Sequence, residues 1–290
     1  MDENPLVSVI VPTKNSSRTL ERCLKSIKNQ TYKNIEIIVV DNNSTDNTKE
    51  IARKYTDKVF NVGPERTAQK NFGIKVANGK YLLFIDSDME LSKDVIKECV
   101  ELAEKDYSVG GIIIPERSVG DRFWVKVRDF ERSFYAGTEI ESARFFRKDL
   151  VLRVGGFDED VIFFEESVLP QKIEKLGYNV KARIKSEIFH HEEDFSLFKW
   201  LRKKYYYGKT AWKYVKKYKE YGSKQVSIFY RFGLFLKNKK FYSKPLLALG
   251  LLTLKSLEYV SAGLGFLVGK VGKWNCKYII NGKNQEMKIL

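Results

Sequence analysis

The sequence is poor in cysteine and histidine, and this shortage excludes two kinds of protein. Its 290 residues contain three cysteines, Cys23, Cys99 and Cys276, and two histidines, which are adjacent. Three widely separated cysteines cannot form the disulfide framework of a small secreted domain, and they favour a reducing compartment. No two of them have the spacing of metal ligands, so a cysteine-based zinc site is not expected either.

The beginning of the chain lacks the pattern of a secretory signal peptide. Residues 1–5 lead directly into a short apolar run, without the basic segment and the long apolar stretch of such a signal. Hydrophobic residues nevertheless make up 43% of the chain, which is enough for a core and excludes a disordered protein. We see no internal repeats, and the length suits one large domain or two modest ones.

Acidic residues are scarce in the last third of the chain. Residues 195–290 hold 21 of the 52 Lys and Arg residues but only 3 of the 37 Asp and Glu residues, whereas residues 1–194 are nearly neutral. We therefore predict a globular domain over residues 1–194 joined to a basic region over residues 195–290. Such a region favours an anionic partner, which leaves nucleic acid, a lipid surface and a polyanionic substrate open.

Apolar runs alternate with helical patterns in the first half of the chain. Strands are predicted at residues 7–11, 35–40, 59–62, 81–85 and 110–114, and helices at residues 16–29, 45–55, 66–77 and 92–105. This alternation predicts an α/β fold with a parallel sheet covered by helices on both faces. Ligands of such sheets bind beyond the carboxyl ends of the strands, and there the sequence has Asp41 and Asp86.

Two carboxylates one residue apart follow the strand predicted at residues 81–85. Asp86 and Asp88 can both face one cavity, and they suit a hard divalent cation such as Mg²⁺ or Mn²⁺. The alternative is a solvated turn with helix-capping carboxylates. For Asp41 taken alone, a turn leading into a helix is favoured over a carboxylate that binds a nucleobase or ribose.

Four ordered segments together resemble family 2 glycosyltransferases with the GT-A fold, a Rossmann-like, mostly parallel sheet flanked by helices. They are residues 9–15 (VIVPTKN), 39–46 (VVDNNSTD), 66–73 (RTAQKNFG) and 81–88 (YLLFIDSD). The resemblance continues through residues 155–159 (GGFDE) and covers about residues 6–210. Each segment is unspecific alone, whereas the ordered set is specific for the family.

The resemblance implies where the donor nucleotide binds. Pro12 and Thr13 would line the nucleotide pocket, Asp41 would hold the base, and Arg66 would lie along the nucleoside. Lys203 and Lys204 belong to a basic, aromatic stretch similar to one that lies near the donor diphosphate or a lipid phosphate. For these two lysines a solvated basic helix is the alternative.

The resemblance also implies a metal site and a base. Asp86 would contact the ribose or metal-bound waters, Asp88 would bind Mn²⁺ or Mg²⁺ directly, and His190, with His191 as fallback, would complete the metal site or hold the diphosphate. We expect both histidines to lie in a loop.

The family usually has an acidic pair at the start of a helix, and its second member often acts as general base. Here the pair is Glu165 and Glu166. The sequence departs from the family pattern at Glu166, where Asp is commoner, and at Val168, where a second Asp is frequent. We expect Glu166 to be the base, and the alternative is a favourable interaction of both glutamates with the helix dipole.

An apolar segment at residues 245–268 is long enough to span a bilayer. Lys255 and Glu258 lie near its middle, however, and they can pair on one helical face. A charge at the centre of a bilayer costs about 2.5–3.5 kcal/mol, so we expect a helix that lies in the membrane interface. A spanning helix and a soluble helical subdomain are the alternatives.

The function expected from these features is a metal-dependent, inverting transfer of a hexose from a GDP- or UDP-sugar to a lipid-linked or glycan acceptor hydroxyl. The enzyme would be a peripheral or monotopic protein on the cytoplasmic face of the cell membrane. A polyprenyl- or dolichyl-phosphate glycosyltransferase is the alternative, because a phosphate acceptor needs no base. A non-enzymatic binder of nucleic acid or anionic surfaces is disfavoured, since it leaves the ordered aspartates unexplained, and no nucleic-acid partner is expected.

Overall fold

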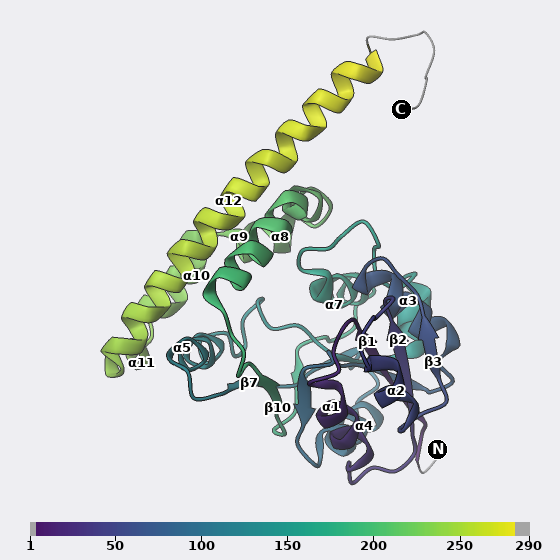
Figure 1. The fold of residues 1–290 in the computed structure, drawn as a ribbon. Coiled ribbons are helices and arrows are strands. Elements are labelled where there is room, and N and C mark those ends of the chain that lie inside the picture. Colours follow the sequence, from purple (N-terminus) through teal and green to yellow (C-terminus); the bar gives the residue numbers. More distant parts are fainter. Residues whose placement is uncertain (1–3, 282–290) are drawn as a thin grey trace.

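A seven-stranded sheet forms the centre of the computed structural model, which describes residues 4–281, with side chains up to residue 270 (Figure 1). The strands lie in the order β3-β2-β1-β4-β8-β6-β9. Their bounds are β1 (Val7–Thr13), β2 (Ile35–Asp41), β3 (Val59–Asn61), β4 (Tyr81–Phe84), β6 (Gly111–Ile113), β8 (Phe145–Arg147) and β9 (Ala182–Arg183). Neighbouring strands are parallel, except that β8 is antiparallel to both β4 and β6.

The predicted α/β fold with a mostly parallel sheet is therefore confirmed. The direction of β8 is a difference from the expectation of a parallel sheet. Hydrophobic periodicity reports which residues are buried and carries no information on strand direction, so the sequence pattern could not reveal it.

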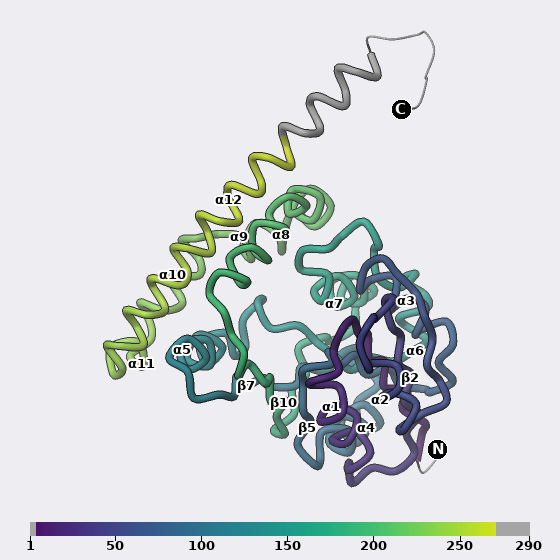
Figure 2. The backbone as a smooth tube through the Cα atoms, in the orientation of Figure 1, coloured from purple at the N-terminus to yellow at the C-terminus, as the bar shows by residue number. Residues whose placement is uncertain are grey.

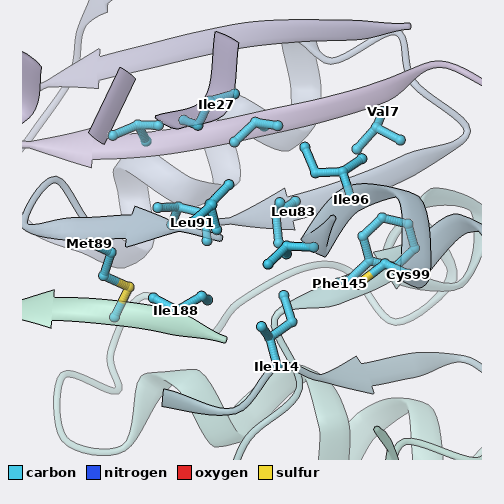
Figure 3. Packing of buried hydrophobic residues seen from close by; sticks show 14 of the residues in the cluster. Val7, Ile27, Leu83, Met89, Leu91, Ile96, Cys99, Ile114, Phe145 and Ile188 are labelled. Atoms are coloured by element: carbon cyan, nitrogen blue, oxygen red, sulfur yellow. The ribbon is translucent and has the colours of Figure 1, made fainter. Parts of the chain in front are cut away.

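Helices cover both faces of this sheet. They are α1 (Leu20–Lys28), α2 (Thr48–Arg53), α3 (Arg66–Val76), α4 (Val95–Lys105), α6 (Lys148–Arg153) and α7 (Val168–Glu174). In β1, Val9 and Val11 pack in one hydrophobic cluster with α1 and α4, whereas Ile10 packs in a second cluster with α3, α6 and α7. Figure 3 shows the first cluster, in which Leu83 of β4 lies close to Ile96 of α4. Every side chain of β1 is buried, which agrees with the mostly apolar sequence of the strand.

A second, three-stranded sheet lies beside the first and brings distant segments together. It consists of β5 (Met89–Leu91), β10 (Ile188–His191) and β7 (Glu116–Val119), in the order β5-β10-β7. The two histidines, which the sequence placed in a loop, therefore lie in a strand. The antiparallel pairing of β10 with β5 sets His190 opposite Met89, next to Asp88.

The C-terminal region is helical, as predicted. It contains α8 (Leu197–Lys217), α9 (Lys219–Val226), α10 (Ile228–Leu236), α11 (Lys239–Ser243) and α12 (Pro245–Asn281). An unpredicted helix, α5 (Phe123–Arg132), packs in one hydrophobic cluster with α10, α11 and α12. The predicted domain boundary at residue 194 falls between β10 and α8, and it stays a prediction.

Glycines allow α8 and α12 to lie side by side at close range (Figure 2). A Cβ atom added at Gly208 would lie 2.1 Å from the carbonyl oxygen of Ala262, and one added at Gly265 would lie 2.1 Å from the carbonyl oxygen of Tyr205. Backbone therefore meets backbone along this seam, which fixes the position of the basic, aromatic residues of α8 relative to α12.

Candidate active site

The ends of β1 and β2 meet at one edge of the sheet. Thr13 is the register partner of Asp41, and Gln69 of α3 donates a hydrogen bond of 2.9 Å to the carbonyl oxygen of Thr13. Asp41 is fully buried, and its carboxylate accepts hydrogen bonds from the backbone N–H and the hydroxyl of Ser44. This is the geometry of a turn-forming aspartate, and the predicted contact of Asp41 with a nucleobase stays a prediction.

Two hydroxyl oxygens near this edge have no hydrogen-bond partner among the described residues. They are the buried Oγ1 atoms of Thr13 and Thr67, at the end of β1 and in the first turn of α3. Buried polar atoms without a partner are rare in folded proteins, so these two atoms are candidates for contact with a bound ligand.

Asp86 follows β4 and lies between two guanidinium groups. Its carboxylate oxygens are 3.6 Å from Arg144 and 3.9 Å from Arg66. Burial alone would raise the pKa of Asp86, but the charges of Arg144, Lys70 and Arg66 outweigh burial and hold this pKa well below its usual range. Asp86 is therefore ionised at any physiological pH.

His190, and not His191, faces the aspartate pair. Its Nδ1 atom lies 3.6 Å from Asp88 and 3.6 Å from Glu192, and this buried atom has no hydrogen-bond partner among the residues that the structure describes. Burial lowers the pKa of His190, which favours the neutral ring that metal binding requires. Both ring nitrogens of His191 instead lie within hydrogen-bond distance of carboxylates, 2.7 Å from Glu90 and 3.1 Å from Glu193.

Binding of a divalent cation near Asp88 and His190 depends on the metal ligands that the substrate contributes. No group of three or more His, Cys, Asp and Glu side chains within the described part of the chain is arranged to hold a metal by itself. Mg²⁺ is usually bound by one or two carboxylates together with substrate phosphates. Asp88, with a side chain 42% exposed, and the unpaired Nδ1 of His190 fit such a shared site.

The two carboxylates of the acidic pair, Glu165 and Glu166, differ in their ion pairs with cations. Both residues lie in a short 3-10 helix, Glu165–Ser167, that leads into α7. Glu165 is 3.1 Å from Arg66 and 3.4 Å from Lys70. Burial would raise its pKa, but these two cations lower it.

Glu166 differs, because no Lys, Arg or His of the described residues forms an ion pair with it. Burial, and then the charge of Glu165, raise the pKa of Glu166. Both carboxylates line a cavity of about 580 Å³. A carboxylate with raised proton affinity beside a cavity has the property that a general base needs.

This cavity lies between the sheet edge and the C-terminal helices. Arg66 and Asp86 lie on its wall toward the sheet, and Tyr259, Ala262 and Phe266 of α12 lie on its helical wall. The sequence thus indicated residues of the first wall, whereas only the fold sets them opposite α12.

The two predicted lysines of α8 line the cavity in different ways. Lys203 has no carboxylate within 4.0 Å among the described residues, and its Nζ atom lies 5.6 Å from the ring centre of Tyr207. Lys204 lies 3.8 Å from Glu258 and 4.3 Å from the ring centre of Trp200, and burial lowers its pKa to about 8. Of these two lysines, Lys203 is therefore the one available to an anionic ligand.

Four residues of the site were missed by the sequence analysis. Arg144 joins Asp86 to Glu116, Glu192 lies beside His190, Lys70 pairs with Glu165, and Tyr207 accepts a 3.0 Å hydrogen bond from Arg66. Lys70 follows Arg66 by one helical turn, so the i, i+4 spacing could have indicated it. Tyr207 belongs to the basic, aromatic stretch that contains Lys203 and Lys204, whereas Arg144 and Glu192 reach the site from segments with no local signal.

Comparison with known proteins places this site in a family. The family described as "Glycosyl transferase family 2" matches residues 8–158, more than half of the chain. The chain belongs to this family. As a family 2 glycosyltransferase it also has the expected fold, and the resemblance drawn from the sequence is confirmed.

Two curated relatives are similar to the N-terminal part of this family 2 glycosyltransferase. The GalNAc(5)-diNAcBac-PP-undecaprenol beta-1,3-glucosyltransferase of Campylobacter jejuni is 37% identical over 114 residues, covering 36% of this chain and 36% of the relative. The poly(ribitol-phosphate) beta-glucosyltransferase of Bacillus spizizenii is 35% identical over 112 residues, covering 35% of this chain and 18% of the relative. The chain thus spans about a third or less of the length of these two relatives.

A solved structure shares the fold over most of the chain. A mannosyltransferase of Pyrobaculum calidifontis in complex with GDP-Man and Mn²⁺ aligns with 92% of this chain and 88% of its own, with a TM-score of 0.65 and 20% identity. At this identity the likeness shows the GT-A fold alone.

Proposed function

We propose that this protein transfers a hexose, with inversion, from a nucleoside-diphosphate sugar to the hydroxyl group of a lipid-linked acceptor. The observation that carries the proposal is the position of Glu166, a carboxylate with a raised pKa and no ion pair to a cation among the described residues, on the wall of the cavity. The ion-paired residues Arg66, Asp86 and Glu165 surround the same cavity. A base therefore adjoins a charged pocket that suits a diphosphate.

The donor nucleotide would bind at the ends of β1 and β2. Pro12 and Thr13 line this edge, and the unpaired Oγ1 atom of Thr13 supports a contact with the nucleotide. Lys203, the exposed cation without a carboxylate partner, would bind the diphosphate. A screen of GDP- and UDP-sugars identifies the base and the sugar.

Asp88 and His190 would hold Mn²⁺ or Mg²⁺, which when bound neutralises the charge of the departing diphosphate. Asp86 would orient the ribose or metal-bound waters. Its two guanidinium neighbours, Arg144 and Arg66, keep it ionised and fix its position. These assignments are supported by the unpaired Nδ1 atom of His190 beside Asp88.

Glu166 would accept the proton of the acceptor hydroxyl. The hydroxyl oxygen forms a bond to the anomeric carbon while the bond between this carbon and the diphosphate oxygen breaks, and the electron pair leaves with the nucleoside diphosphate. Attack from the face opposite the leaving group inverts the anomeric configuration. Glu165 would stay ionised between Arg66 and Lys70 and would keep the proton affinity of Glu166 high.

A lipid-linked acceptor is supported by the relatives and by the helical region. The name of the relative from Campylobacter jejuni specifies an acceptor carried on PP-undecaprenol. In this chain, α12 contains one segment, Pro245–Lys270, that is long and apolar enough to cross a membrane, and 28% of its most apolar window is buried. We propose that this segment lies in the interface on the cytoplasmic face of the membrane.

Two of the three charges of this segment, Lys255 and Glu258, support the interfacial position. Lys255 is ion-paired at 2.6 Å with Glu258 and at 2.5 Å with Glu131 of α5, so both charges point into the protein, and the predicted pairing is confirmed. The opposite face of α12 is apolar and solvent-exposed, with exposed fractions of 63% for Leu249, 63% for Val260 and 60% for Leu267. Apart from Lys270 at its end, the exposed side chains of Pro245–Lys270 carry no charge. Such a face on a helix that is otherwise packed on protein suits a membrane surface.

A donor screen tests this function. The full chain in detergent is given GDP- and UDP-sugars with and without Mn²⁺ or Mg²⁺, and release of nucleoside diphosphate is measured in the presence of membrane-lipid extract. We expect metal-dependent release from one donor, and a loss of at least 100-fold in Asp88→Ala. Asp121→Ala, at an exposed aspartate outside the cavity, is the control and should retain full activity. Full activity of Asp88→Ala would overturn the metal assignment.

A further inference from the structure

Two of the nine Lys and Arg side chains that line the cavity have no carboxylate partner. The other seven lie within 4.0 Å of a carboxylate oxygen: Arg66, Lys70, Arg128, Arg132, Arg144, Lys204 and Lys255. Lys203, on the donor side, is the first exception, and Arg231 of α10 is the second. Lys203 is exposed, whereas Arg231 is 8% exposed. Among the described residues that line the cavity, only Arg231 is therefore a buried positive charge with no carboxylate within 4.0 Å, and the carboxylate of Glu131 acts on it from beyond the hydroxyl of Tyr135.

The guanidinium group of Arg231 is held firmly by neutral partners. Its Nε atom donates a 3.0 Å hydrogen bond to the carbonyl oxygen of Gln225, and one Nη atom donates a 2.9 Å hydrogen bond to the hydroxyl of Tyr135. The group also lies 5.2 Å from the ring centre of Tyr135 and 5.7 Å from that of Phe164. The second Nη atom makes no hydrogen bond within the described part of the chain, and Arg231 lines the cavity.

A buried charge with no carboxylate in contact is unfavourable for the fold, because burial removes the water that would hydrate it. Hydrogen bonds to neutral groups and contacts with ring faces offset part of this cost. A guanidinium group with a free donor beside a cavity also matches the geometry of a phosphate oxygen. The arrangement therefore suits an anionic ligand better than a purely structural role.

The neighbours of Arg231 favour a contact with the acceptor over a contact with the donor. Phe164, on which it packs, immediately precedes Glu165 and Glu166, and Gln225 donates a 3.0 Å hydrogen bond to the hydroxyl of Ser167 in the same 3-10 helix. The apolar residues Val226 and Ile228, close to Arg231 in the chain, and Ala262 and Phe266 of α12 also line the cavity, as do the ion-paired carboxylates Glu131 and Glu258. An anion bound here would lie near the base and against an apolar wall.

We propose that Arg231 binds a phosphate group of the acceptor, and that the acceptor is a phosphate ester with an apolar portion. This inference rests on the proposed function, since it assigns the second substrate of the same cavity. A phosphate ester can be lipid-linked or soluble, and the apolar wall formed by α10 and α12 favours the lipid-linked form.

Calorimetric titration of the full chain in non-ionic detergent tests the inference with three probes. They are farnesyl phosphate, the neutral alcohol farnesol, and glycerol 3-phosphate as a soluble phosphate ester. Arg231→Gln is compared with Arg231→Lys, which keeps the charge but loses the planar fork of donors. Arg153→Gln is the matched control, because Arg153 is an exposed arginine of α6 without an ion pair among the described residues. Binding of GDP and UDP with Mn²⁺, and the melting temperature, are measured for every variant.

We expect the wild type and Arg153→Gln to bind farnesyl phosphate equally, Arg231→Gln to bind it at least tenfold more weakly, and Arg231→Lys to show an intermediate affinity. Farnesol should bind weakly and without dependence on Arg231. Arg231-dependent binding of glycerol 3-phosphate with equal affinity would also support the phosphate subsite and would identify a soluble acceptor. Unchanged affinity of Arg231→Gln, or no binding of either phosphate to the wild type, would overturn the inference.

The remaining measurements separate this inference from the proposed function. Normal nucleotide binding together with no phosphate binding would overturn the acceptor subsite alone, whereas absence of nucleotide binding in the wild type would overturn the proposed function. If Arg231→Gln does not fold, the comparison of Arg231→Lys with the wild type decides, and equal affinity of these two proteins for farnesyl phosphate would contradict the inference.

Discussion

At the scale of single residues, neighbouring side chains of one type have different chemistry because their partners differ. Glu165 is ion-paired with two cations, whereas Glu166, one residue later, has none among the described residues. His190 faces Asp88 with an unpaired nitrogen, whereas both nitrogens of His191 lie close to carboxylates. Among the described residues, the candidate base is the glutamate without an ion pair to a cation, and the candidate metal ligand is the histidine with a buried nitrogen that makes no hydrogen bond.

The raised pKa of Glu166 leads to a prediction of pH dependence. A base must be ionised, so activity should fall as the pH drops through the pKa of Glu166, at a pH higher than the ordinary value of 4.5 for a glutamate. Replacement of Glu166 by Gln should lower kcat by about 10²- to 10⁴-fold and abolish this acidic limb, and Glu166→Asp should keep part of the activity. The measurement is kcat/KM for the acceptor as a function of pH.

Glu101→Gln is the control for this experiment, because Glu101 is an exposed residue of α4 far from the cavity lining. It should leave both the rate and the pH profile unchanged. If Glu166→Gln kept near-normal turnover with a prenyl phosphate as acceptor, the nucleophile would be a phosphate oxygen, and the polyprenyl-phosphate alternative would replace the hydroxyl acceptor.

At the scale of secondary-structure elements, the seam between α8 and α12 holds the helical wall of the cavity in place. Lys203 and Tyr207 reach the cavity from α8, and Tyr259 and Phe266 reach it from α12. Their relative positions depend on the close approach of the two backbones, which only glycine permits at this distance.

A matched pair of Gly→Ala variants tests this seam. A Cβ atom at Gly265 would lie 2.1 Å from a backbone oxygen of α8, whereas one at Gly233 of α10 would have nothing within 4 Å. Alanine is favoured over glycine in a helix by about 1 kcal/mol, so Gly233→Ala should leave the melting temperature unchanged or raise it. Gly265→Ala should instead lower it by several degrees and weaken acceptor binding. Equal melting temperatures of the two variants would show that the contact between α8 and α12 accommodates the added Cβ atom without loss of stability.

At the scale of the whole molecule, α12 has one face on the protein and one face to the outside. Figure 1 shows it running along one side of the molecule, next to α8 and α10. Exposed lysines lie on and beside α11, at Lys237, Lys239, Lys240 and Lys244. An apolar stripe flanked by cations suits an anionic lipid surface, and it would bring the cavity mouth near lipid-linked acceptors.

Vesicle flotation tests this orientation. The double variant Leu249→Glu, Leu264→Glu places two charges on the exposed face of α12 without touching the buried ion pairs. We expect its binding to vesicles of anionic phospholipid to be at least tenfold weaker than that of the wild type. Leu152→Glu is the control, because Leu152 is an exposed leucine of α6 with an exposed fraction of 56%, and its binding should be unchanged. Equal binding of the wild type and the double variant would exclude this face as the contact surface.

The sequence by itself determined the α/β alternation, the strand ends at Asp41 and Asp86, and the family. These are properties of short segments, because burial on both faces makes a strand apolar and a parallel sheet sets strand ends at one edge. The pairing of Lys255 with Glu258 was equally local, since it depends on one helical turn.

Tertiary structure alone decided the antiparallel direction of β8, the strand that sets His190 beside Asp88, and the second wall of the cavity. Arg144 reaches Asp86, and Arg231 reaches Tyr135, across long stretches of chain. Such contacts depend on strand register and on helix packing, which local periodicity does not encode. For that reason the sequence indicated the residues of the donor side, whereas the unpaired charge that we assign to the acceptor became visible only in the fold.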